Sequence, residues 1–261
     1  MEAGTQLGTL ASGLLGSLVA GLGTGVGALL IFVRAQWGRR AQTLMLSFAA
    51  GVMLGATAFS LVAPSLDLAT AAFGETAGAL TTAASVALGA LGVWLIHAQV
   101  PHEHFERGPD GRATVDLGRN WLFILAITLH NFPEGMSVGV SYGGDASTSA
   151  AVTLGIGVQN LPEGLAVAAA LLGDGFSRAR AFAIALATGL VEPVGGLIGA
   201  TAVSFSDELL PWGLGFAGGA MLFVISGEVI PETHREGDEN VATFALVVGF
   251  LVMMLFDVLL A

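Results

Sequence analysis

Eight long apolar stretches divide the sequence, and each is long enough to cross a lipid bilayer as a helix. A spanning helix needs about 20 mainly apolar residues. Of the 261 residues, 54% are hydrophobic and only 11% are charged. The stretches cover residues 8–33, 41–66, 76–99, 120–141, 147–172, 180–204, 211–230 and 241–260. We therefore expect an all-α integral membrane protein with eight transmembrane helices, which form a single transmembrane domain over residues 1–261.

The basic residues alternate strictly between the two sides of these stretches. The chain has no lysine, and its nine arginines lie in the connections after the first, third, fifth and seventh stretches. They are Arg34, Arg39, Arg40, Arg107, Arg112, Arg119, Arg178, Arg180 and Arg235. Because arginine-bearing loops tend to stay in the cytoplasm, both termini are expected outside. We expect a prokaryotic plasma (inner) membrane protein whose surroundings are the lipid bilayer, with no nucleic-acid partner.

Three further features limit the fold. The chain has no cysteine, which excludes thiolate metal sites and a disulfide framework. Glycines four residues apart, such as Gly21 with Gly25 and Gly195 with Gly199, let helix backbones approach closely. The start lacks the basic region of a cleaved signal peptide, so the first stretch is expected to be retained. These features predict a closely packed helical bundle.

Two similar hexapeptides lie inside the fourth and fifth stretches. His-Asn-Phe-Pro-Glu-Gly occupies residues 130–135, and Gln-Asn-Leu-Pro-Glu-Gly occupies residues 159–164. Only a few residues around 142–145 join the two stretches, so these must form an antiparallel pair in which the motifs meet at similar depth. In hydrocarbon an unsatisfied polar group costs on the order of several kcal/mol. The motifs should therefore face each other or a bound ligand.

Helical spacing places the polar groups of each motif on adjoining faces. His130 and Glu134 are four residues apart and share a face, with Asn131 on a neighbouring edge. The same spacing is repeated by Gln159, Asn160 and Glu163. Pro133 and Pro162 lack an N–H and disturb the preceding turn. They predict broken helices at mid-membrane, a feature of many transporters.

A third carboxylate, Glu192, lies in the sixth stretch and is also followed by a proline. Three glutamates together in a bundle would repel one another and resist ionisation unless they shared protons or a cation. No arginine lies in the interior of a stretch, where it could neutralise them. Imidazole with carboxylate and amide oxygens suits zinc, iron or manganese better than calcium or magnesium. The sequence thus predicts a divalent transition-metal site within the membrane.

The two hexapeptides together resemble the signature of the ZIP (Zrt/Irt-like) family of divalent metal transporters, especially its bacterial GufA-like branch. The resemblance extends to Val-Glu-Pro-Val-Gly-Gly at 191–196 and to Gly-Glu-Val-Ile-Pro-Glu-Thr-His at 227–234, and it covers essentially the whole chain. It implies inverted three-helix repeats around a central helix pair, often as a homodimer. It also implies a transporter, not an enzyme, that moves zinc or else iron, manganese or cadmium into the cytoplasm and carries no prosthetic group.

The family pattern also implies a ligand set. One ion would be held by His130, Glu134, Gln159 and Glu163, with Met53 nearby. A second would be held by Asn131, Asn160 and Glu192, with Glu134 and Glu163 shared. Asn160 stands where an aspartate occurs in some relatives, which removes a charge and leaves the occupancy of the second site open. The family is thought to move metal by an elevator, in which the metal-bearing helices slide against the other spans.

Residues near the ends of the spans are candidate pathway residues. Glu228, Glu232 and His234 end the seventh span and could form a cytoplasmic exit. Asp67 and Asp257 lie near the outer ends of the second and eighth spans and could line an entrance. His102 and His104 belong to the longest connection, 99–119, which we expect to be a flexible cytoplasmic loop. They could catch a released ion, although a solvated loop without a specific role is favoured.

Two other function classes fit some of these features. An intramembrane metal-dependent hydrolase would also place histidine and glutamate in helices, but the motif His-Glu-x-x-His is absent. A proton-coupled carrier of a small solute would use the glutamates as relays but leaves His130 and the paired amides unexplained. The sequence leaves open the physiological metal, proton coupling as against facilitated diffusion, the dimer contact and metal sensing by the histidine-containing loop.

Overall fold

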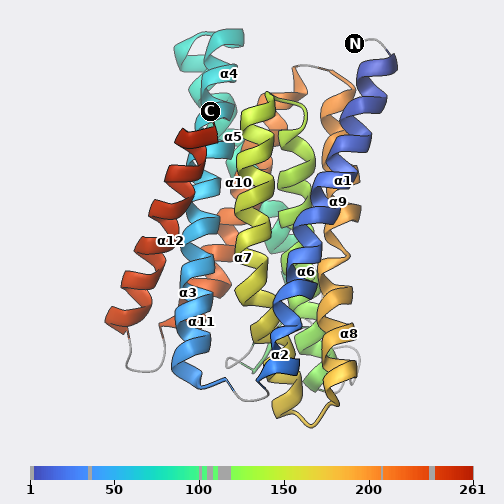
Figure 1. Ribbon diagram of the computed structural model, residues 1–261. Coiled ribbons are helices and arrows are strands. Elements are labelled where there is room, and N and C mark those ends of the chain that lie inside the picture. The colour runs from blue at the N-terminus through green and yellow to red at the C-terminus, as the bar shows by residue number, and fades with distance from the viewer. Residues whose placement is uncertain are drawn as a thin grey trace.

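Long helices that run side by side make up the computed structural model (Figure 1). It describes residues 3–34, 37–99, 102–104, 108–110, 119–206, 208–234 and 239–260. The helices are α1 (Ala3–Ala28), α2 (Leu30–Val33), α3 (Arg39–Gly55), α4 (Ala63–Phe73), α5 (Glu75–Gln99), α6 (Arg119–Ser141), α7 (Ala146–Gly173), α8 (Arg178–Gly189), α9 (Glu192–Ser204), α10 (Leu209–Val224), α11 (Ile230–Thr233) and α12 (Glu239–Leu260). Two π-helical segments, η1 (Ala56–Val62) and η2 (Ile225–Val229), interrupt them. The all-α prediction is confirmed.

Seven helical runs in the described part of the chain are long and apolar enough to cross a membrane. They are Gln6–Val33, Arg40–Phe73, Glu75–Gln99, Ala146–Gly173, Arg178–Ser204, Leu209–Val229 and Glu239–Leu259. The expected span over 120–141 corresponds to α6, which carries the first hexapeptide and is not among the seven. The structure thus supports a membrane-spanning helical bundle, and the count of eight spans is not confirmed.

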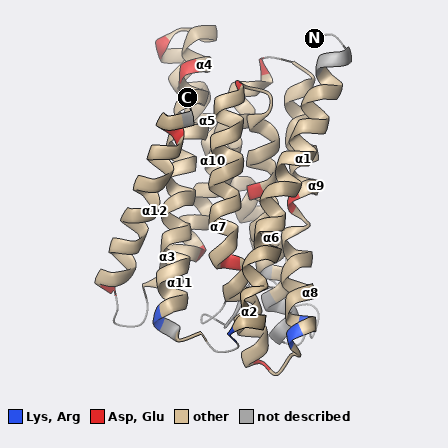
Figure 2. Cartoon of the chain, viewed as in Figure 1, with Lys and Arg blue, Asp and Glu red and all other residues tan. Residues whose placement is uncertain are grey.

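Charge is distributed unevenly between the two ends of the bundle. Figure 2 shows the described arginines at the end where α3 and α8 begin, and Figure 1 places both termini at the opposite end. This agrees with the alternation of arginines along the sequence. The run from α3 through η1 to α4 is continuous, and α4 ends, next to the start of α5, at the end of the bundle that holds the termini (Figure 1).

The helix breaks do not fall where the sequence predicted them. Pro133 and Pro162 lie inside α6 and α7, which continue through them, so the expectation of broken helices there was wrong. A break falls instead at residues 190–191, between α8 and α9. Pro193 is in the first turn of α9, where its missing N–H costs no helical hydrogen bond. The break places Glu192 at the start of α9.

Prolines also explain the two π-helical segments. η1 ends two residues before Pro64, and η2 ends two residues before Pro231. A proline ring clashes with the carbonyl four residues earlier, and a widened turn relieves that clash while the helix continues. Such π-turns often occur at functional sites. Here η2, with Glu228, joins α10 to α11 near the end of a continuous helical run.

The connection over 99–119 contains regular structure that the sequence did not predict. Two short strands, β1 (His102–His104) and β2 (Gly108–Asp110), pair antiparallel with His102 opposite Asp110. The expectation of an irregular flexible loop is therefore corrected for these residues. The side chains of His102 and His104 lie outside the described residues.

The short connection between α6 and α7 is as predicted, and Asp145 ends it by capping α7. Its carboxylate accepts hydrogen bonds from the Ser147 hydroxyl and from the backbone N–H of Thr148, at 2.7 Å for the latter. These bonds lower the pKa of Asp145 to about 2. The cap therefore stays charged at neutral and mildly acidic pH, and α6 and α7 form the expected antiparallel pair.

The helices sort into two bundles by their closest contacts. In the first bundle, α1 packs against α7 and α9, and α6 packs against α9. In the second bundle, α3 packs against α12, and α5 packs against α10. Glycines make these approaches possible: a Cβ on Gly51 would overlap the Leu246 carbonyl in α12, and one on Gly219 would overlap Val86 in α5. The glycines therefore allow α3 to pack closely on α12 and α10 to pack closely on α5.

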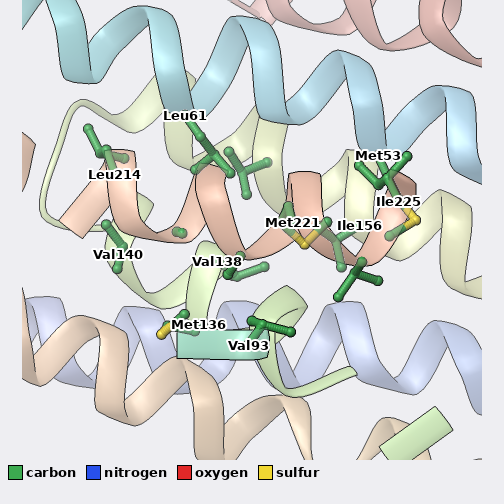
Figure 3. Packing of buried hydrophobic residues seen from close by; sticks show 14 of the residues in the cluster. Met53, Leu61, Val93, Met136, Val138, Val140, Ile156, Leu214, Met221 and Ile225 are labelled. Carbon is green, nitrogen blue, oxygen red and sulfur yellow. The ribbon is translucent and has the colours of Figure 1, made fainter. Parts of the chain in front are cut away.

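The main hydrophobic core lies where the two bundles meet. Figure 3 shows Met53 of α3 and Ile225 of η2 near Ile156 of α7, in a cluster that also contains Met136, Val138, Leu214 and Met221. Many large apolar side chains on the outer faces are exposed, including Val33, Phe205 and Phe244. In a bilayer these side chains contact lipid, whereas the cluster between the bundles is buried.

Candidate metal centre

α6 and α7 bring three potential metal ligands together inside the first bundle. His130, Glu134 and Glu163 each offer an atom within 4.8 Å of the others, and all three side chains are buried. His130 Nε2 lies 3.9 Å from Glu134 Oε1, as their shared helix face predicts. Glu163 comes from the antiparallel partner helix. The predicted meeting of the two hexapeptides is therefore confirmed.

An amide network joins this cluster to Glu192. Gln159 Nε2 donates to Glu134 Oε2 at 2.6 Å and to Asn160 Oδ1 at 2.5 Å. Asn160 Nδ2 donates to Glu192 Oε1 at 2.7 Å and to the Ala20 carbonyl at 2.8 Å. The network therefore ties α1, α6, α7 and α9 together around the carboxylates.

Several buried polar atoms in the centre have no hydrogen-bond partner among the described residues. They are Oε1 of Glu134, Glu163 and Gln159, Oε2 of Glu192, and both side-chain polar atoms of Asn131. A buried polar group without a partner costs on the order of 1–3 kcal/mol. Five of the six atoms are oxygens, and an imidazole lies beside them. This donor set can satisfy a divalent transition-metal ion.

Glycines at the end of each hexapeptide set the spacing of the helices around the centre. A Cβ on Gly135 would overlap the backbone of Glu192 in α9, and a Cβ on Gly164 would overlap the Thr24 carbonyl in α1. Each motif helix therefore touches the backbone of a neighbouring helix at the level of its glutamate. This close approach brings Glu192 and the Ala20 carbonyl within reach of Asn160.

Replacing Gly164 by alanine should lower the stability of the protein by about 1–3 kcal/mol, because the methyl group forces α1 and α7 apart. Gly173→Ala is the matched control, since a Cβ at this other α7 glycine meets no atom within 4 Å. Thermal unfolding of the purified protein in detergent measures the difference. Equal melting temperatures for the two variants would contradict the packing argument.

The second bundle contributes a carboxylate to the edge of the centre. Glu228 Oε2 of η2 lies 3.5 Å from His130 Nδ1, and Glu228 Oε1 lies 2.8 Å from His97 Nδ1. The His97 ring also packs edge-on against Phe223, with centroids 5.7 Å apart. Sequence reasoning proposed Glu228 as an exit residue but missed His97. The signal was present, since His97 is an ionisable residue in the last turn of an apolar span.

The other predicted residues are more scattered. Met53 is buried in the core between the bundles. His234 contacts Thr233 and the Ile230 carbonyl through Nδ1, and Thr243 through Nε2, so it joins α11 to α12. Asp257 accepts a hydrogen bond from Ser60 at 2.8 Å, whereas Asp67 is exposed on α4. The side chain of Glu232 lies outside the described residues.

In comparison with known proteins, the chain is similar to proteins that are named zinc transporters. The family model described as ZIP Zinc transporter matches residues 97–257. The chain is 47% identical to "Zinc transporter GufA" of Myxococcus xanthus, over 95% of this chain and 98% of that protein. It is 44% identical to "Zinc transporter ZIPB" of Bordetella bronchiseptica, over 93% and 79% of the two chains. It is 34% identical to "Zinc transporter ZIP11" of Homo sapiens, over 94% and 96%.

Proposed function

Because the chain belongs to the ZIP zinc transporter family, we propose that it carries zinc through the buried centre between α6 and α7. The protein is a membrane transporter of metal ions, not an enzyme. The observation that carries the zinc proposal is the buried cluster of His130, Glu134 and Glu163, with ligand atoms within 4.8 Å. Iron, manganese and cadmium fit the same donors and would be alternative substrates.

The first ion would be held by His130 Nε2 and by oxygens of Glu134, Gln159 and Glu163. Two of these oxygens, Glu134 Oε1 and Glu163 Oε1, have no other partner among the described residues. Met53 belongs to the second bundle and is proposed only as a neighbour of this ion. A metal there would replace the hydration that burial removes from the carboxylates, which accounts for the presence of Glu134 and Glu163 in an apolar bundle.

We propose a single ion in the present centre, because amide hydrogen bonds take the place of a second one. Asn160 Nδ2 lies between Glu192 Oε1 and the Ala20 carbonyl, a position in which a cation would otherwise bring the two oxygens together. An amide donor stabilises both oxygens without a metal. Asn131 and Glu192 would then shape the polar surroundings of the ion and would not bind a second one.

The proposed direction of transport is into the cytoplasm, with both termini outside. The clustering of the described arginines at the opposite end from the termini supports this orientation (Figure 2). The division into two bundles with an apolar interface supports an elevator, in which the first bundle slides along the second while it carries the metal. A homodimer in a prokaryotic plasma membrane remains part of the proposal.

Zinc uptake into vesicles tests this function. The purified protein is reconstituted in liposomes that contain a fluorescent zinc indicator, and zinc is added outside. We expect saturable zinc entry that protein-free liposomes do not show. Folded protein that binds zinc but moves neither zinc nor iron, manganese or cadmium, across a range of pH, would contradict a carrier and favour a metal-dependent hydrolase or a sensor.

A further inference from the structure

We propose that Glu228 of the second bundle positions the imidazole of His130 for metal binding, and that His97 holds Glu228 in place for this task. The inference rests on the proposed function of the centre. It assigns Glu228 a role other than that of an exit ligand: its carboxylate acts on the metal through His130 and is not itself bound to the ion.

The two nitrogens of His130 face different partners. Nε2 points toward the metal cluster, 3.9 Å from Glu134 Oε1, while Nδ1 lies 3.5 Å from Glu228 Oε2. A neutral imidazole has one N–H and one lone pair, and a hydrogen bond from one nitrogen fixes which of the two remains free to bind a metal. A carboxylate at Nδ1 favours the tautomer with the proton on Nδ1. The lone pair of Nε2 is then directed at the site.

The carboxylate of Glu228 is itself fixed in position. Its other oxygen lies 2.8 Å from His97 Nδ1, and the His97 ring is packed against Phe223 of α10. The side chains of His97 and Glu228 are 11% and 10% exposed, so both are largely shielded from water. A carboxylate between two imidazoles in this setting has little freedom to turn away from His130.

The two partners belong to different bundles. His130 is on α6 in the first bundle, whereas Glu228 is on η2 and His97 is on α5, both in the second. The hydrogen bonds described for Gln159 and Asn160 join helices of the first bundle. The positioning contact therefore crosses the interface, and it depends on how the two bundles lie against each other.

Loss of a carboxylate that orients a metal-bound histidine typically weakens metal affinity by about 10–100-fold. We expect a loss of this size in zinc affinity for Glu228→Ala in the purified full-length chain. Because Glu228 acts through His130, the same change in a His130→Ala background should alter affinity by less than about twofold. This non-additivity is the signature of coupled residues. Zinc affinity is measured by competition with a chromophoric chelator in detergent.

Two further measurements separate positioning from other roles. Glu228→Gln preserves the side-chain volume and keeps an oxygen that can accept a hydrogen bond from His130 Nδ1. The loss of zinc affinity in Glu228→Gln should therefore be smaller than in Glu228→Ala. In a His130→Ala background, Glu228→Gln should cause no loss of zinc affinity. It serves as the test if the alanine variant does not fold. X-ray absorption of zinc-loaded Glu228→Ala should still show one imidazole and the wild-type number of oxygen ligands, because Glu228 is not bound to the ion.

The outcomes separate a failure of the positioning role of Glu228 from a failure of the proposed function. Equal losses of affinity in the His130 and His130→Ala backgrounds, or an oxygen ligand missing in Glu228→Ala, would make Glu228 a ligand in its own right and overturn the proposal. Unchanged affinity in Glu228→Ala would overturn it as well. A wild-type protein that neither binds nor moves zinc would instead refute the proposed function, and that comparison uses no variant.

Discussion

Replacing Glu134 and Glu163 together by glutamine should reduce zinc entry into proteoliposomes to the level of protein-free vesicles. Both carboxylates are buried and each has an oxygen without a partner among the described residues. Glutamine has nearly the same shape, but it is neutral and a weak ligand for zinc. Because the change removes two anionic ligands from one site, the loss of flux should exceed the roughly 10–100-fold typical of residues that only support a ligand.

The matched control is the double variant Glu75→Gln and Glu239→Gln. These exposed glutamates begin α5 and α12, so the control alters the net charge by the same amount away from the centre. It should transport zinc like the wild type. Both double variants are compared at equal reconstituted amounts after size-exclusion chromatography. A Glu134 and Glu163 variant that folds and still transports zinc at more than a tenth of the wild-type rate would rule out this centre.

Asn160→Asp should raise the number of bound zinc ions from one to two. In the wild type, Asn160 Nδ2 donates to Glu192 Oε1 at 2.7 Å. Aspartate has no donor, so the variant would hold two carboxylates face to face in a buried site, where their repulsion must be relieved by a proton or a cation. Glu192 Oε2, which has no partner among the described residues, is available as a further ligand. A second divalent ion relieves the repulsion best.

Equilibrium dialysis followed by elemental analysis counts the ions. Asn240→Asp makes the same chemical change at an exposed position in the first turn of α12, and it should leave the stoichiometry at one. Two ions already present in the wild type would show that the amide network does not replace a metal. A single ion in Asn160→Asp at saturating zinc would show that charge at residue 160 does not decide the occupancy of the second site.

Local spacing predicted part of this centre well. Residues four apart on a helix share a face, so the pairing of His130 with Glu134 followed from the sequence, and the short connection at Asp145 ensured that Glu163 would lie opposite. The long apolar stretches also predicted the helices, because a helix forms between residues that are close together in the chain. These features depend on contacts between near neighbours in the chain.

Other features depended on how distant helices rotate against one another. The contact of Asn160 with Glu192 requires the approach of α7 to α1 and of α6 to α9, which glycine spacing suggests but does not orient. His97 was overlooked because its partner, Glu228, comes from a span far along the chain. The effect of each proline also depended on context, since α6 and α7 continue through theirs, whereas α9 has Pro193 in its first turn.

The length of the helical run that ends with α4 determines the surroundings of Asp67. The run from Arg40 to Phe73 has 34 residues and, at 1.5 Å per residue, is about 50 Å long, compared with a hydrocarbon layer of about 30 Å. Even a strongly tilted helix of this length extends into the aqueous phase at one end. Asp67, exposed on α4 near the end of this run, can therefore keep its hydration shell. The excess length lifts this charge out of the lipid, where an anion would be costly, and holds it in water at the end of the bundle where both termini lie.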